Sequence, residues 1–260
     1  MPQPLNRVRS DIEFHEDAHV LLNKPVLAGI VTTIFAHSSL IDQRLSLLLV
    51  RVLGADAAPA LAMFDTLIAQ HLQIGALEAA AQEALTPEEL RVFQTTLKVE
   101  QSVQSHRHRL GHWIWGRALQ LPDALLLAEP KAQTERDREL ALALEQSDTG
   151  SLNIEQAVKL NRYDPRTVLV YTQTELEQIG RDFLTAAHIA LLTVIYLDGI
   201  FRGRRKLPPT QAASSPKLRE QVFQQLYTQR LFREVWDRTI QAPNNNPQSP
   251  LGSPQQGPSG

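Results

Sequence analysis

The clearest helix signal in the chain is in residues 86–111, TPEELRVFQTTLKVEQSVQSHRHRLG. Thr86 suits the N-cap of a helix, Pro87 suits its first position, and Glu89 stands three residues after Thr86, as in a capping box. Apolar residues then recur every three or four positions, which is the period of one helical face. The sequence therefore predicts a long helix from Pro87 to near Gly111.

Other helices are expected on both sides of this one. Apolar residues recur at helical spacing from Pro25 as far as Gly54, and glycine is a typical helix stop. Thr172 and Glu175 repeat the capping-box spacing before a long apolar segment. An Ala-rich segment and a last amphipathic segment also favour helix. The expected helices cover residues 25–54, 59–85, 172–201 and 217–240.

The helical period is interrupted before Thr172. The runs DALLLAEP (123–130) and RTVLVYT (166–172) are short, apolar and bounded by proline or Asp-Pro. Such runs are typical of strands, so we expect them to pair antiparallel. Between them, residues 135–146 favour helix and residues 147–151 are expected to form a loop.

These elements predict a mainly α protein, an antiparallel up-and-down helical bundle with a small two-stranded antiparallel β insertion at about residues 122–172. The helical domain is expected to cover residues 25–240, after a polar N-terminal segment at residues 1–24. Residues 241–260 carry no charge and are rich in Pro, Gly, Asn and Gln. They cannot bury enough apolar surface to fold, so we expect a disordered tail.

The composition narrows the classes of function. The chain of 260 residues has 26 basic and 28 acidic groups, a net charge of -2, which gives no bulk electrostatic reason to bind nucleic acid or an anionic membrane. Cysteine is absent, which excludes disulfides, thiol nucleophiles and Cys-ligated zinc. The most apolar segment, residues 186–197, contains His188 and Thr193 and is closed by Asp198, so it reads as a buried helix rather than a membrane span. With no signal-like segment at the N-terminus, we expect a cytoplasmic protein.

The end of the central helix is chemically unusual. Residues 105–116, SHRHRLGHWIWG, contain three His, two Arg and two Trp. On a helix, Glu100, Gln104, His108 and His112 are each four residues apart and form a polar row beside the apolar stripe. We expect this row to lie at the edge of a groove between helices.

The segment Arg107-His-Arg-Leu-Gly-His112 resembles the motif of HEPN-domain proteins, in which Arg and a polar residue are followed by three residues and His. Many small members have the form Arg-Asn-x-Leu-Ala-His-Gly. Arg107, Leu110 and His112 stand at the matching positions, whereas His108 replaces Asn, Gly111 replaces Ala and Trp113 replaces Gly. The resemblance covers about residues 25–200, and its distinctive part is the six-residue motif.

The resemblance implies a metal-independent endoribonuclease of the toxin or defence type, which works as a homodimer and needs no cofactor. Arg107 would hold the scissile phosphate, since a guanidinium presents fixed donors to phosphate oxygens. His112 would act as general acid or base, since histidine titrates near neutrality, and His108 would orient one of the two. The products would be a 2′,3′-cyclic phosphate and a 5′-hydroxyl. An antitoxin or other regulatory protein is a further expected partner.

The spacing of the motif adds a constraint. Five residues place Arg107 and His112 roughly 140° apart on an ideal helix, so they cannot face one phosphate within a single regular helix. Either the helix loosens near Gly111 or a second chain supplies the partner residue, and we expect both. Asp42 is a supporting candidate that would orient Arg107 or His112. Its alternative is an ordinary surface Asp near Arg44.

For several residues the sequence allows two interpretations. His106, His108 and His112 are a candidate zinc set, although no Cys or carboxylate beside them completes it. Trp113 and Trp115 would either stack on bases or pack near the β insertion or at a dimer contact. The basic residues that are candidates for RNA binding, or for neutralising helix ends, are Arg109, Arg202, Arg204, Arg205 and Lys206.

The competing hypothesis belongs to another class of function. A non-catalytic helical binding or regulatory module would use the same groove to hold a partner helix, a nucleotide or RNA without cutting it. Relief of growth inhibition by His112→Ala would favour the enzyme, whereas a stable co-purified partner without toxicity would favour the binding module.

Overall fold

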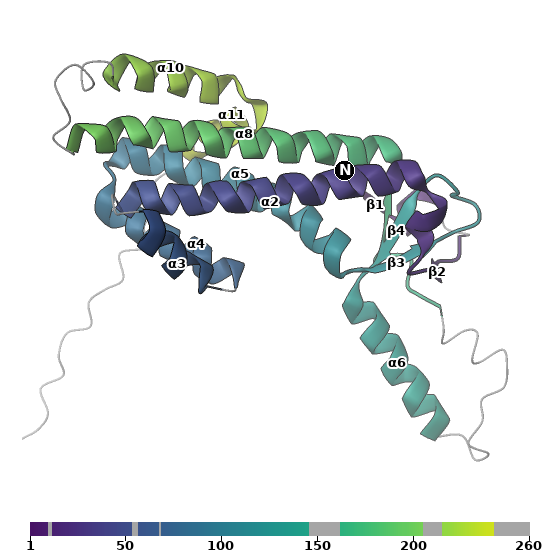
Figure 1. Ribbon diagram of the computed structural model, residues 1–260. Helices are drawn as coiled ribbons and strands as arrows, with labels where there is room; N and C mark the ends of the chain where they lie inside the picture. The colour runs from purple at the N-terminus through teal and green to yellow at the C-terminus, as the bar shows by residue number, and fades with distance from the viewer. Residues whose placement is uncertain (10–11, 54–56, 68, 146–161, 205–214, 242–260) are drawn as a thin grey trace, which may run out of the picture.

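The computed structural model describes residues 1–9, 12–53, 57–67, 69–145, 162–204 and 215–241. The expected loop at 147–151 lies outside these described residues, and so does all but the first residue of the expected tail at 241–260. Within the described part, the protein is mainly helical with one antiparallel sheet, as the sequence predicts (Figure 1).

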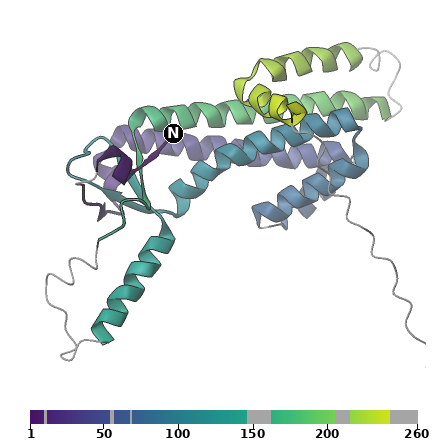
Figure 2. The ribbon, with the colours of Figure 1, turned by 180° about the vertical axis from the view of Figure 1, so that it is seen from behind.

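The long helices form where the sequence patterns place them. Three of them lie along one another in both views, namely α2 (Pro25–Leu53), α5 (Pro87–His112) and α8 (Gln173–Arg204) (Figures 1 and 2). The capping box of α5 is formed, because the amide of Thr86 donates to Glu89 Oε2 at 2.9 Å and the side chain of Thr86 caps the amide of Glu89 in return. At α8 the amide of Thr172 donates to Glu175 at 3.1 Å in the same way.

Two of the expected helices are each divided in two. The segment 59–85 forms α3 (Ala57–Asp65) and α4 (Gln70–Ala84), and the segment 217–240 forms α10 (Ser215–Thr228) and α11 (Arg230–Gln241). Thr66 closes α3, since its amide and hydroxyl both donate to the carbonyl of Met63. Neither break contains Gly or Pro, so helix propensity alone gives no sign of it.

The expected two-stranded β insertion is wrong in size, because the described residues form a five-stranded sheet of order β1-β5-β4-β3-β2. The predicted pair is present: β4 (Leu125–Ala128) and β5 (Val168–Tyr171) are antiparallel, with Leu126 opposite Val170. The additional strands are β3 (Ile114–Arg117), β1 (Gln3–Pro4) and β2 (His15–Glu16).

The N-terminal segment is therefore part of this sheet rather than a separate polar extension. Strand β1 pairs with β5 and strand β2 pairs with β3, so the segment supplies both edges. Its apolar residues Leu5, Ile12 and Phe14 are buried against the sheet. The short helix α1 (Leu5–Val8) lies between β1 and β2, and the 3-10 helix η1 (Val20–Asn23) leads from β2 to α2. Strands of two residues are too short to show an alternating pattern, which explains why the sequence gives no sign of them.

The sheet lies at one end of the helical bundle, next to the C-terminal end of α5 (Figure 1). From it, α6 (Pro130–Glu145) projects away from the helices and has no buried residue. The base of α6 is fixed to the sheet by Arg136, which pairs with Glu16 at 2.7 Å and lies 4.5 Å over the ring of Tyr163. Tyr163 also donates a hydrogen bond to Glu16.

The core lies between α2, α5 and α8 and is almost wholly apolar. A buried hydrogen bond of 2.7 Å joins the hydroxyls of Thr96 and Thr193 across α5 and α8. Helices α2 and α8 are each long and apolar enough to cross a membrane by length and composition, a test that long core helices also pass. Both contribute residues to the main core, among them Ile34, Ile41, Phe183 and Leu197.

Candidate functional site

Helix α5 carries the Arg107–His112 motif and remains regular to its last residue. The helix ends at His112, and the amide of Trp113 donates to the carbonyl of Arg109 at 2.9 Å. The expected loosening near Gly111 is therefore wrong. The capping box fixes the start of α5, and its apolar stripe packs along almost its full length, so no local signal unwinds the last turn.

A regular helix keeps Arg107 and His112 roughly 140° apart. Both side chains are exposed. One chain therefore does not bring the guanidinium and the imidazole to the same point, and the structure leaves a second chain as the remaining route to a shared site.

Arg107 lies on the side of α5 that faces α2. Its charge acts on Asp42, which is the acidic residue that the sequence singles out on that helix. The surrounding protein raises the pKa of the Asp42 carboxyl, and the Arg107 charge opposes this increase. The Asp42 side chain nevertheless remains exposed to solvent. The charge of Arg107 on α5 therefore acts on Asp42 of α2, whose carboxyl is partly desolvated.

His112 lies beside His108 on another side of the helix. The two rings have centroids 4.8 Å apart and are tilted by 45°. Both histidines are exposed. The structure therefore brings these two candidate residues together within one chain, as their four-residue spacing predicts.

Two members of the predicted polar row, Gln104 and His108, lie at a groove between helices, whereas Glu100 is buried and His112 does not line this groove. Gln104 is buried and fixed, because its carboxamide oxygen accepts a hydrogen bond from Ser38 at 3.1 Å and its nitrogen donates to Glu100 at 3.5 Å. Gln104 and His108 line a pocket of about 410 Å³ between α4 and α5, which we call the α4–α5 pocket. Its lining residues are His71, Ile74, Gly75, Glu78, Gln101, Gln104, Ser105 and His108.

Two of these lining residues, His71 and Glu78, are functional candidates that sequence reasoning missed. They lie seven residues apart on α4 and share one face with Ile74 and Gly75. The spacing of three, four and seven residues is visible in the sequence, but only the packing of α4 on α5 shows that this face meets His108.

Arg109 and the two tryptophans that follow the motif pack where α5 leads into the sheet. Arg109 is half-buried and lies 5.6 Å from the ring of Trp113. The indole of Trp115 donates to the carbonyl of Leu110 at 2.9 Å. Both Trp side chains are half-buried and pack against the main core, so the structure places them in packing rather than on a free stacking surface.

His106 points away from the other two histidines of the motif. Its ring meets the ring of Tyr171 edge-on, with centroids 6.5 Å apart. Burial lowers the pKa of His106, and the charge of Arg109 acts in the same direction. His106, His108 and His112 therefore do not converge as a zinc set. Within the described ranges, no group of three His, Cys, Asp or Glu side chains is arranged to hold a metal ion.

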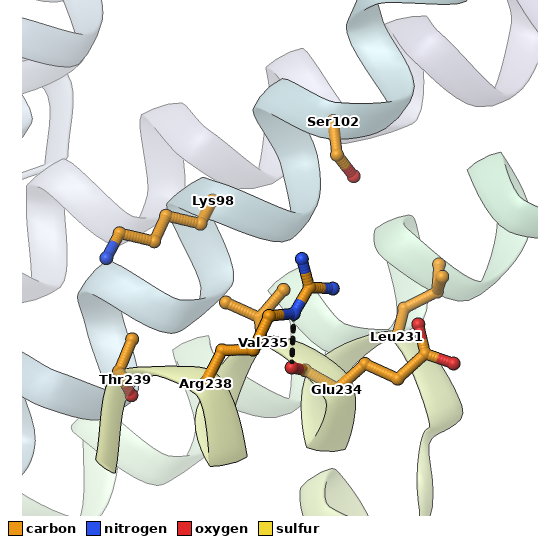
Figure 3. A pocket seen from close by; sticks show the side chains of 7 residues that line it. All are labelled: Lys98, Ser102, Leu231, Glu234, Val235, Arg238 and Thr239. Carbon is orange, nitrogen blue, oxygen red and sulfur yellow. Dashed lines mark hydrogen bonds between the residues drawn. The ribbon is translucent and has the colours of Figure 1, made fainter. Parts of the chain in front are cut away.

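A second pocket, of about 380 Å³, lies between α5 and α11 (Figure 3). Lys98 and Arg238 both line it, but their side chains extend in different directions (Figure 3). The Nε of Arg238 donates to the carbonyl of Glu234 at 2.9 Å, and the carboxylate of Glu234 pairs with Arg230. The two cations do not converge, so this pocket lacks the geometry of a phosphate site.

A third pocket, of about 460 Å³, is a mainly apolar groove on α2 and α8, where Gly29 and Gly180 form part of the wall. The predicted basic cluster lies elsewhere. Arg202 and Arg204 fall in the last turn of α8, while Arg205 and Lys206 lie outside the described residues.

No family model, curated protein or solved structure matches this chain.

Proposed function

We propose that this protein is a metal-independent endoribonuclease of the toxin or defence type, built on an HEPN-like helical bundle and active as a cytoplasmic homodimer. The observation that carries the proposal is the arrangement on the end of α5, where exposed Arg107 lies within the influence of Asp42 and exposed His112 lies 4.8 Å from His108. Arg107, which can bind a phosphate, and His112, which can transfer a proton, are thus five residues apart, and each has a polar neighbour.

The chemistry follows from these side chains. Arg107 holds the non-bridging oxygens of the scissile phosphate and neutralises the charge that grows there. His112 transfers a proton, either from the ribose 2′-hydroxyl or to the leaving 5′-oxygen. The 2′-oxygen forms a bond to phosphorus as the bond from phosphorus to the 5′-oxygen breaks, which leaves a 2′,3′-cyclic phosphate and a 5′-hydroxyl. His108 orients the imidazole of His112 through their ring contact.

The divergence of Arg107 and His112 supports a shared site between two copies. A two-fold axis near the end of α5 would bring Arg107 of one copy to His112 of the other, and symmetry would create two such sites. Asp42 is then a positioning residue for Arg107, because its carboxylate attracts the guanidinium from α2.

A second candidate function is a non-catalytic binding module, which the α4–α5 pocket favours because it is a formed cavity beside the motif. RNA and a regulatory protein such as an antitoxin are the proposed partners in either case.

The test is cleavage of a labelled single-stranded RNA in the presence of EDTA. Wild type is expected to release 2′,3′-cyclic phosphate ends, and Arg107→Ala or His112→Ala is expected to reduce the rate at least about 100-fold, the usual contribution of a positioned acid or base. His188→Ala is the matched control, since His188 is an exposed histidine on α8. No cleavage by wild type, or cleavage by both variants at the wild-type rate, would refute the enzyme.

A further inference from the structure

The α4–α5 pocket has features that the motif alone does not explain. One face of α4 supplies His71, Ile74, Gly75 and Glu78, and α5 supplies His108. Its volume of about 410 Å³ lies within the range of small-molecule sites, which is roughly 300–1,000 Å³. Gly75 leaves the wall open, because a Cβ built there would meet no atom of the described structure within 4 Å.

The chemistry of the pocket suits a nucleobase. Ile74 is an apolar wall residue against which an unstacked RNA base can pack, and the imidazoles of His71 and His108 add polar ring edges. The carboxamide of Gln104 is buried and bonded to Ser38 and Glu100, so it forms a fixed part of the wall. These groups are of the kind that single-stranded RNA readers use.

The charge of the pocket is uneven along α4. Glu78 is the carboxylate among its described lining residues, and it stands two helical turns, about 10 Å, from His71. A carboxylate accepts hydrogen bonds from an exocyclic amino group and repels phosphate. A bound nucleotide would therefore place its base near Glu78 and its phosphate near the imidazoles.

The pocket lies next to the proposed catalytic group, with His108 between them. His108 lines it, and the His108 ring lies 4.8 Å from the ring of His112. We propose that the α4–α5 pocket binds one nucleotide of single-stranded RNA whose base carries an exocyclic amino group, and so places the next phosphate at His112. This inference rests on the proposed function for its placement of the scissile phosphate, but the binding of the nucleotide is independent of cleavage.

Binding is tested first with cytidine 3′-monophosphate as the probe and the histidine Cε1–H NMR signals as the readout. The expected result is a shift of the His71 and His108 signals with no shift of His19, which lies at the start of η1 and does not line the pocket. Uridine 3′-monophosphate, which lacks the amino group, is expected to bind about tenfold more weakly, and Glu78→Gln is expected to remove this difference. Unchanged His71 and His108 signals, or equal affinity of wild type for the two nucleotides, would overturn the inference.

The pocket can be filled without removing a titratable group. Gly75→Leu places a side chain in the open space and is expected to abolish the NMR shifts, whereas Gly29→Leu makes the same change at an equally open position in the groove of α2 and α8. If both variants bind alike, the site lies elsewhere and the inference fails.

The same variants separate this inference from the proposed function. RNA cleavage by wild type that Gly75→Leu reduces at least about tenfold supports both. Nucleotide binding without any RNA cleavage keeps the pocket and refutes the nuclease. Cleavage that Gly75→Leu leaves unchanged, with no nucleotide binding, keeps the nuclease and refutes the pocket.

Discussion

At the scale of single residues, Asp42 and Arg107 are the clearest case in which the structure joins two candidates from distant parts of the sequence. The charge of Arg107 restrains the pKa increase that burial imposes on Asp42. Removing that charge in Arg107→Ala should raise the pKa of Asp42 further, and the pH titration of the Asp42 carboxyl ¹³C signal measures it. Arg44→Ala, two residues from Asp42, is the control and should leave the pKa of Asp42 unchanged. An unchanged titration in Arg107→Ala would mean that the two residues do not interact.

His106 predicts a pH dependence of stability. Burial holds the pKa of His106 below its ordinary value of 6.5, so the unfolded chain binds a proton more readily than the folded chain. The free energy of unfolding therefore keeps its full value above the ordinary pKa. It decreases as the pH falls from that value towards the lowered pKa of His106 in the folded protein. The Nδ1 atom of His106 is buried without a hydrogen-bond partner among the described residues, so Leu should be tolerated.

The measurement is urea unfolding at several pH values between about 7.5 and 5. His106→Leu is expected to lose less stability than wild type over this range, while His188→Leu, at an exposed position, should follow wild type. If the free energy of unfolding depends on pH in the same way for wild type and His106→Leu, burial of His106 does not destabilise the protein at low pH.

At the scale of elements, α5 is the part of the fold that the sequence predicts best. Its capping box, its apolar period and its end near Gly111 are all local signals, and the structure confirms each to within one or two residues. The regularity of its last turn is less predictable, because glycine near a helix end is compatible with either an intact or a broken turn.

Gly111 gives a direct test of that regularity. A Cβ at Gly111 would lie 3.7 Å from the ring of Phe35, an ordinary van der Waals contact, so alanine fits. Gly111→Ala is expected to raise the free energy of unfolding by about 0.5–1 kcal/mol, the helix propensity difference, as measured by chemical denaturation. Gly29→Ala in α2 is the control and should give a similar gain. A loss of stability in Gly111→Ala alone would show that the last turn is not helical.

The sheet shows why the remaining elements were harder to predict. Strands β1 and β2 have two residues each, and their pairing depends on segments more than 90 residues away in sequence. Gly116 in β3 is the residue that permits the pairing with β2, because a Cβ there would overlap the ring of Phe14 and the carbonyl oxygen of His15. Only the assembled sheet reveals this close approach.

Gly116→Ala is therefore expected to lower the free energy of unfolding by about 1–3 kcal/mol, the usual cost of overpacking. Denaturation measures the loss, and backbone NMR should place the largest changes at His15 and Glu16. Wild-type stability in this variant would contradict the packing of β2 on β3.

At the scale of the whole molecule, the candidate site was predictable only in part. The polar row and the contact of His108 with His112 follow from helical spacing within one element. His71 and Glu78 line the pocket because α4 packs on α5. The charge of Arg107 acts on Asp42 because α2 packs on another side of α5. Contacts between elements depend on packing, which spacing along the chain does not encode.

Mixing of subunits tests whether two copies share one site through Arg107 and His112. Arg107→Ala and His112→Ala, each inactive alone, are unfolded together, refolded and assayed for RNA cleavage in EDTA. Half of the dimers should then be mixed, and each should have one intact site of its two, so roughly one quarter of the wild-type activity should return. An inactive mixture, beside an active wild type treated in the same way, would contradict the shared site.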